Sequence, residues 1–173
     1  MPTASGQIVW TLKIRLLHWL MAAFVLINLF LYNESGDIHN WLGYGTLAII
    51  FFRLLLGLIS NGYDGFRNFP LQPAELFYFI RNLFNRKKKD YPGHNPAAAY
   101  AYVIFWLLVI GLGVTGILLV HVEEYFGSQP LEEIHEVFAN SVIVFLVVHF
   151  TGMTLDAVLH RRYSWMSMIN GKK

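Results

Sequence analysis

Residues 131–160, LEEIHEVFANSVIVFLVVHFTGMTLDAVLH, decide the fold of this 173-residue chain. The stretch is apolar and long enough to cross a bilayer, for which an α-helix needs about 20 residues, yet it contains His135 and His149. Because an α-helix has about 3.6 residues per turn and a rise of about 1.5 Å, the two imidazoles differ by about 40° in direction and lie about 21 Å apart along the axis. Two histidines at two depths of one membrane helix predict two cofactor sites.

The composition is typical of a membrane protein. Hydrophobic residues make up 55% of the chain and charged residues 14%, compared with about 25% charged residues in a soluble domain. The net charge of +2 gives no indication of a nucleic-acid partner. The chain has no cysteine, which excludes disulfides, iron–sulfur clusters, thiolate zinc sites and covalently attached c-type haem. The seven histidines are therefore the nitrogen ligands available to a metal.

The hydrophobic pattern predicts an all-α fold, an integral membrane four-helix bundle that forms a single domain over residues 1–173. The first apolar stretch lacks a clear cleavage site, so we expect a retained transmembrane helix rather than a signal peptide. Residues 61–95 are predicted to form a loop that contains a short amphipathic interfacial helix. The four transmembrane helices are expected at about residues 10–32, 38–60, 97–120 and 131–160.

The charge distribution predicts the orientation. If the four helices alternate in direction, every Lys and Arg other than Arg53 falls on the side of the termini and the 61–95 loop, or at its boundary. The opposite side carries acidic residues and no basic ones. The positive-inside rule therefore predicts that both termini and the 61–95 loop are cytoplasmic. For the basic cluster in that loop we favour a topology signal with anionic-lipid contact over a specific partner site.

The predicted topology sorts the four spanning histidines by depth. His18 and His149 fall in the inner half of the membrane, and His39 and His135 fall near the outer face. A polar ring in hydrocarbon is unfavourable without a partner, and two imidazoles on facing helices can hold a haem iron. We therefore predict His18 and His149 as ligands of an inner haem iron, and His39 and His135 as ligands of an outer one. The alternative is that each histidine only packs and hydrogen-bonds.

Several other residues are candidates at these depths. Arg53 lies 14 residues after His39, near the depth of the inner site, where it would offset the charge of a haem propionate or, alternatively, snorkel to the interface. The glycines in the second and third helices would admit either a neighbouring helix or a flat ligand. Of the remaining histidines, His94 lies in a loop, and His121 and His160 lie at helix ends, where interfacial histidines are common; the alternative for His160 is a substitute inner ligand.

These motifs resemble the prokaryotic cytochrome b561 family, which includes the cytochrome b subunits of nickel–iron hydrogenases and formate dehydrogenases. The resemblance covers nearly the whole chain. Its marks are the His-Trp pair at residues 18–19, His39 with Arg53, the GHNP turn at residues 93–96, His135 with His149, and the closing HRR and MINGKK segments. It implies a four-helix bundle with two haem b groups, and the four histidines match the ligand positions of the family one by one.

The expected function is transmembrane electron transfer by a dihaem b-type cytochrome in the bacterial inner membrane. The resemblance implies exchange of electrons with the quinone pool and with a periplasmic or membrane redox partner or a small oxidant, which would make the chain a quinone-linked oxidoreductase. The alternative is a membrane-anchor cytochrome b subunit of a larger hydrogenase-type or formate dehydrogenase-type oxidoreductase. A homo-oligomer is compatible with either. A histidine-rich di-iron membrane enzyme is disfavoured because the histidines are isolated rather than clustered, and a transporter because the chain lacks paired interrupted helices.

Overall fold

The computed structural model describes residues 8–32, 36–84, 89, 91–160 and 163–172, and the side chains of His160 and Ser164 are outside this description. Within these residues the fold is helical, with no strand beyond a single bridge between Ile8 and Lys172. The elements in chain order are α1 (Leu12–Phe30), α2 (Asp37–Ile59), η1 (Phe66–Asn68), α3 (Pro73–Arg81), α4 (Pro96–His121), η2 (Glu123–Tyr125), α5 (Gln129–His160) and α6 (Ser164–Asn170). Four of them, α1, α2, α4 and α5, are long and apolar enough to cross a membrane. The all-α four-helix membrane bundle predicted from the sequence is thus confirmed.

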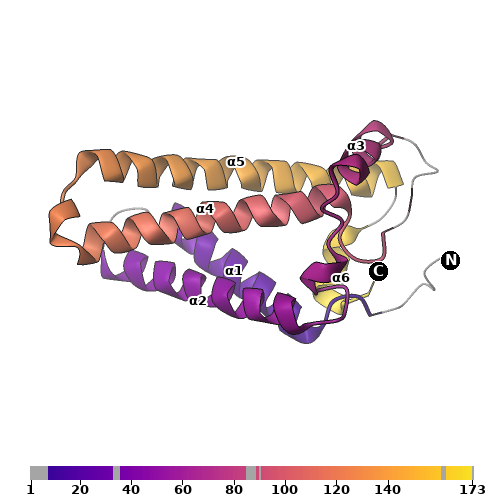
Figure 1. The fold of residues 1–173 in the computed structure, drawn as a ribbon, viewed down its shortest axis with the longest axis horizontal. Helices are drawn as coiled ribbons and strands as arrows, with labels where there is room; N and C mark the ends of the chain where they lie inside the picture. Colours follow the sequence, from indigo (N-terminus) through magenta and orange to yellow (C-terminus); the bar gives the residue numbers. More distant parts are fainter. Residues whose placement is uncertain (1–7, 33–35, 85–88, 90, 161–162, 173) are drawn as a thin grey trace.

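The four long helices run up and down in alternation, so that two helix pairs lie side by side (Figure 1). α1 packs on α2, α2 packs on α4, and α4 packs on α5. The short helices α3 and α6 gather at one end of the bundle with the start of α1, and η2 lies at the other end, between α4 and α5 (Figure 1). Each long helix begins and ends within two residues of its predicted bounds.

Local sequence explains where the helices start. Asn95 caps α4, because its side-chain oxygen accepts the backbone N–H of Ala98 at 2.8 Å, and Pro96 occupies the first turn, where no N–H is needed. Gly36 holds the cap position, and Asp37 is the first residue of α2, where its charge favours the positive end of the helix dipole.

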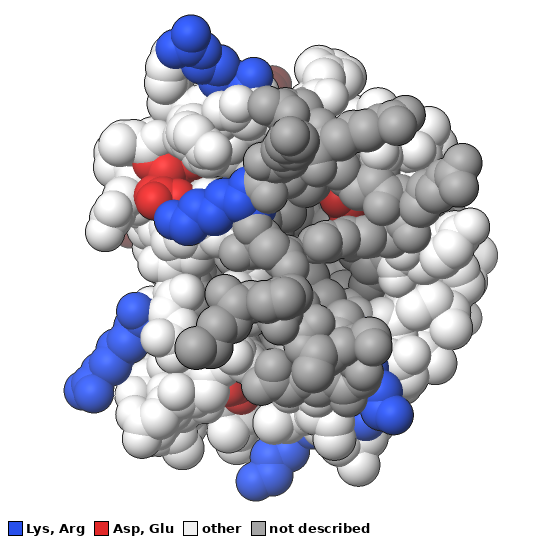
Figure 2. Space-filling model, turned by 90° about the vertical axis from the view of Figure 1, so that its right-hand side faces the viewer, with Lys and Arg blue, Asp and Glu red and all other residues white. Residues whose placement is uncertain are grey.

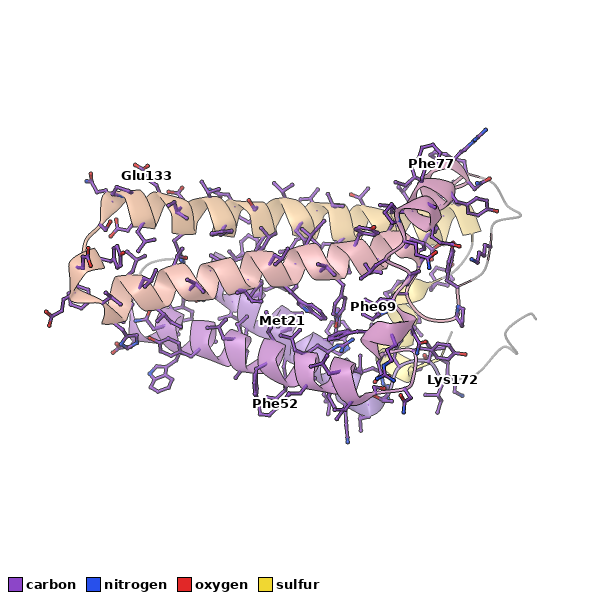
Figure 3. The ribbon with its side chains drawn as sticks, in the orientation of Figure 1. Met21, Phe52, Phe69, Phe77, Glu133 and Lys172 are labelled. Carbon is purple, nitrogen blue, oxygen red and sulfur yellow. The ribbon has the colours of Figure 1, made fainter. Side chains whose placement is uncertain are left out.

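An apolar core fills the middle of the bundle, with one buried residue from each long helix: Val25, Ile50, Val109 and Val142. Large apolar side chains also cover the outside of the bundle. Phe52 points away from α2 and is 56% exposed, whereas Met21 points inward (Figure 3). Exposed apolar side chains along a long helix are the expected surface of a protein whose solvent is lipid.

The two ends of the bundle differ in charge. Lys and Arg side chains project around the end that carries α3 and α6 (Figure 2). Within the described residues the opposite end carries no Lys or Arg. Its acidic side chains are Asp37, Glu123, Glu124, Glu132, Glu133 and Glu136. Glu133 and Lys172 mark these two ends in Figure 3. We refer to them as the basic end and the acidic end.

Candidate functional site

His39 and His135 meet near the acidic end of the bundle. Their ring centroids lie 6.1 Å apart with an angle of 55° between the rings. His39 comes from the first turn of α2 and His135 from the second turn of α5, two helices that each pack on α4. Both side chains are half-buried. The structure therefore brings together the two histidines that the sequence predicts as the outer pair.

A hydrogen bond fixes the proton on one nitrogen of each ring. Nδ1 of His39 donates to the carbonyl oxygen of Tyr32 at 2.8 Å. Nδ1 of His135 lies 2.7 Å from the hydroxyl oxygen of Thr115, which donates its own proton to the carbonyl of Gly111 at 2.8 Å and therefore accepts from the ring. With Nδ1 protonated in both rings, each Nε2 keeps a free lone pair. Such second partners are typical of metal-binding histidines.

The separation of the two rings fits one metal ion between them. A metal–imidazole bond is about 2.0 Å long and the ring centre lies about 1.1 Å behind the nitrogen, so two imidazoles on opposite sides of one ion have centres about 6.2 Å apart. The observed separation is 6.1 Å. Among the described residues no group of three His, Cys, Asp or Glu side chains forms a metal cluster. Two histidines on opposite sides of an ion leave its other coordination positions open to a cofactor such as a haem.

His18 on α1 and His149 on α5 are the two residues predicted as the inner pair, and both lie nearer the basic end than His39 and His135. The ring of His149 stacks on Phe145, with an angle of 14° and a centroid distance of 6.1 Å, and His18 meets Trp19 edge to face. Both histidines are half-buried. Since His149 lies 14 residues after His135, about 21 Å separates the two levels along α5.

Arg53 lies inside the bundle at the depth of the second pair, with 3% of its surface exposed. Nε donates to the hydroxyl oxygen of Tyr102 at 2.9 Å, and Nη2 donates to the backbone carbonyl of Asp64 at 3.0 Å. The rings of Phe66, Tyr102 and Trp106 surround the guanidinium at 5.2–5.7 Å. Nη1 is buried and has no hydrogen-bond partner. Arg53 thus does not snorkel to the interface, and the two N–H groups of its Nη1 are free to donate inside the bundle.

The sequence of residues 9–171 matches the family described as prokaryotic cytochrome b561. The chain belongs to this family. No curated protein and no solved structure matches it. The family, together with the four apolar helices, establishes a multi-pass protein of the bacterial inner membrane that binds haem b and transfers electrons across the membrane, in a lipid environment and between redox partners.

Glycines of the cytochrome divide into two groups. A Cβ at Gly45, Gly111 or Gly113 would overlap a side chain of a neighbouring helix, respectively Phe24, Phe138 and Leu47, so these three serve helix packing. A Cβ at Gly43, one turn after His39, would meet nothing within 4 Å. The backbone beside the outer pair therefore borders open space, which suits a flat macrocycle. Gly116 lies against the His135 ring itself.

The remaining histidines lie apart from both pairs. His94 packs among the rings of Trp10, Phe69 and Tyr102 at centroid distances of 4.6–5.2 Å. His121 is exposed at the end of α4, and its Nε2 lies 2.7 Å from the hydroxyl of Tyr44. The substitute ligand suggested at His160 lies outside the described side chains.

Thr115 and Tyr102 are the site residues that the sequence reasoning missed. Thr115 orients His135, and Tyr102 holds Arg53. Both lie on α4, a helix in which no haem ligand was predicted. The available signal was weak: each is a polar side chain in an apolar helix, at about the depth of one histidine pair.

Proposed function

We propose that the cytochrome holds two b haems, the outer one between His39 and His135 and the inner one between His18 and His149. In this proposal electrons cross the membrane between the quinone pool and a periplasmic redox partner or small oxidant. The observation that carries it is the 6.1 Å separation of the His39 and His135 rings with both Nδ1 protons fixed. His149 lies 14 residues deeper on α5 and His18 lies on α1 nearer the basic end, which supports a second haem.

A bound b haem supplies reversible one-electron reduction at its iron, and the protein tunes the potential through the axial ligands, burial and hydrogen bonds. At the outer site the carbonyl of Tyr32 and the hydroxyl of Thr115 hold the Nδ1 protons. They thereby leave each Nε2 free to bind the iron and increase the basicity of the ring.

At the inner site Arg53 supplies the positive charge. Tyr102 and the Asp64 carbonyl engage Nε and Nη2, so Nη1 is the donor left for an anionic group. A haem propionate is the anion that a b haem would bring. Burying a guanidinium is costly unless its donors and charge are satisfied, and a propionate would satisfy both.

Between the two levels the core residues Val25, Ile50, Val109 and Val142 exclude water. Ions and protons therefore meet an apolar barrier there. We propose that the basic end is cytoplasmic, since Lys and Arg concentrate in cytoplasmic segments. The outer pair then faces the periplasm, and a lipid-soluble quinone reaches the protein from within the bilayer.

Purified protein in lipid nanodiscs tests this proposal. We expect about two haem b per chain, reversible reduction by a short-chain quinol, and reoxidation by a periplasmic-side oxidant. One haem or none per chain would contradict it. A soluble catalytic subunit that co-purifies in equal amounts would instead support the membrane-anchor alternative.

A further inference from the structure

The two ends of the described chain pair with each other at the basic end. The backbone N–H groups of Val9 and Trp10 both donate to the carbonyl of Gly171, at 2.8 and 3.1 Å, and Ile8 bridges Lys172. Gly171 ends α6 with φ +79°, in the left-handed region that favours glycine. A Cβ at this glycine would lie 2.7 Å from the carbonyl oxygen of Trp10, so the close approach also requires glycine.

Side chains of α1 hold the last turn of α6. Nε1 of Trp19 donates to the carbonyl of Met168 at 3.0 Å, and Nη1 of Arg15 donates to the carbonyl of Ile169. The side chain of Met168 packs on the buried cluster of Val9, Trp10 and Ile14. We call this assembly of residues 8–10, Arg15, Trp19, α6 and residues 171–172 the terminal clasp.

The clasp joins the two helices that carry the inner histidines. Within the described residues α1 packs on α2, α5 packs on α4, and α1 and α5 share no extensive contact of their own. α6 contacts both α1 and α5. Trp19 directly follows His18, and Arg15 lies three residues before it on the same side of α1. The clasp therefore fixes the part of α1 from which His18 projects.

The positions of the outer histidines, His39 and His135, do not depend on the terminal clasp. His39 is on α2 and His135 on α5, and both of these helices pack directly on α4. Thr115 of α4 also bonds the His135 ring. The inner pair, by contrast, sits on the two helices at the ends of the packing order α1–α2–α4–α5.

We infer that Arg15, Trp19 and Gly171 are positioning residues for the inner haem site, which the terminal clasp assembles by setting α1 against α5. This inference rests on the proposed pair of haems. Breaking the clasp releases the inner haem and leaves the outer one bound.

Haem quantification in purified variants tests the inference. The variants are Trp19→Phe, Arg15→Gln, Gly171→Val and removal of residues 164–173. Trp19→Phe removes one hydrogen bond and keeps an aromatic ring. It therefore tests the clasp even where the truncated protein fails to fold. Tyr44→Phe is the matched control, because it removes the hydrogen bond to His121 at the acidic end. We expect haem content to fall from two toward one per chain in the clasp variants and to stay at two in the control.

A second substitution identifies the haem that is lost. Adding His149→Ala to a clasp variant should remove no further haem, whereas adding His135→Ala should remove the one that remains. Wild-type protein without two haems would contradict the proposed function itself. Clasp variants that keep both haems, or that lose both together, would overturn the clasp inference and leave the proposed function standing.

A disulfide across the clasp provides the rescue. The chain has no cysteine, and residues in an antiparallel bridge have Cα atoms about 4.5–5.5 Å apart, within the range that a disulfide spans. Ile8→Cys with Lys172→Cys should therefore crosslink under mild oxidant. In the Trp19→Phe background, oxidised protein should retain two haems per chain and reduced protein should lose the inner one. Equal haem content in both redox states, with the crosslink confirmed by mass, would overturn the inference.

Discussion

The rings of His39 and His135 lie 6.1 Å apart although they come from two different membrane helices, from the first turn of α2 and the second turn of α5. A third helix takes part, since the hydroxyl of Thr115 on α4 accepts a hydrogen bond from Nδ1 of His135. The carbonyl of Tyr32, just beyond α1, does the same for His39. All four long helices or their ends therefore contribute to one site, which is why it depends on the complete bundle.

Single substitution of each paired histidine should remove one haem, because an imidazole lost from one side leaves the iron without an axial ligand. We expect His39→Ala and His135→Ala to remove the same spectral component, and His18→Ala and His149→Ala to remove the other. Reduced-minus-oxidised spectra with haem quantification measure this. The exposed His121→Ala serves as a control that keeps both haems. Loss that fails to follow the pairs would refute the assignment of ligands.

Thr115→Val should raise the midpoint potential of the outer haem. The hydroxyl accepts a hydrogen bond from Nδ1 of His135. This makes the imidazole a better electron donor to the iron, which favours the oxidised state. Its loss should shift the potential upward by about 20–60 mV, the equivalent of ~0.5–1.5 kcal/mol for one electron. Thr46→Val is the matched control, since that buried hydroxyl bonds only its own helix, at the Leu42 carbonyl. A redox titration in which both variants shift alike would argue against the role of Thr115.

The closeness of His39 and His135 could be predicted from sequence, because the depth of a residue in the bundle follows from the order of the helices and the helix rise. The contacts that orient them could not. Thr115 reaches His135 only because α4 is rotated to face α5, and hydropathy does not encode helix rotation in a segment that is apolar on all sides. The cage around Arg53 needs Phe66 and Asp64, whose positions depend on the irregular loop after α2.

Arg53→Gln should lower the midpoint potential of the inner haem, because a buried positive charge favours the reduced, more negative state. A unit charge about 10 Å away at an effective dielectric constant near 20 contributes ~1–2 kcal/mol, or about 40–80 mV. Tyr102→Phe, which frees Nε of Arg53, should give a smaller shift in the same direction. Arg67→Gln, an exposed cation at the same end, is the control and should change little. Unchanged inner potential in Arg53→Gln would exclude the proposed propionate contact.

Gly43→Phe should displace the outer haem and retain the inner one. The space beside this glycine is open and lies one turn from His39, so an aromatic ring there would occupy the volume that the macrocycle needs. Ala48→Phe, a similar enlargement at an exposed position of the same helix, should bind both haems. Haem content distinguishes the two variants. Two haems per chain in Gly43→Phe would mean that the outer macrocycle does not occupy the space beside this glycine.

Electron exchange at the acidic end should be faster with cationic redox partners than with anionic ones. Within the described residues this end carries exposed carboxylates, Glu123 and Glu124 among them, and no basic side chain, so it attracts positive reagents and repels negative ones. For protein reconstituted with the acidic end outward, oxidation by hexaammineruthenium(III) should slow as salt rises, and oxidation by ferricyanide should accelerate. Glu123→Gln with Glu124→Gln should weaken both salt dependences.

Glu75→Gln is the control at the basic end, where hydrogen bonds from Lys89 and Tyr91 lower the pKa of Glu75 and keep it ionised at neutral pH. Its removal should leave both salt dependences unchanged, and an equal effect of the two sets of variants would mean that electrons leave elsewhere than the acidic end.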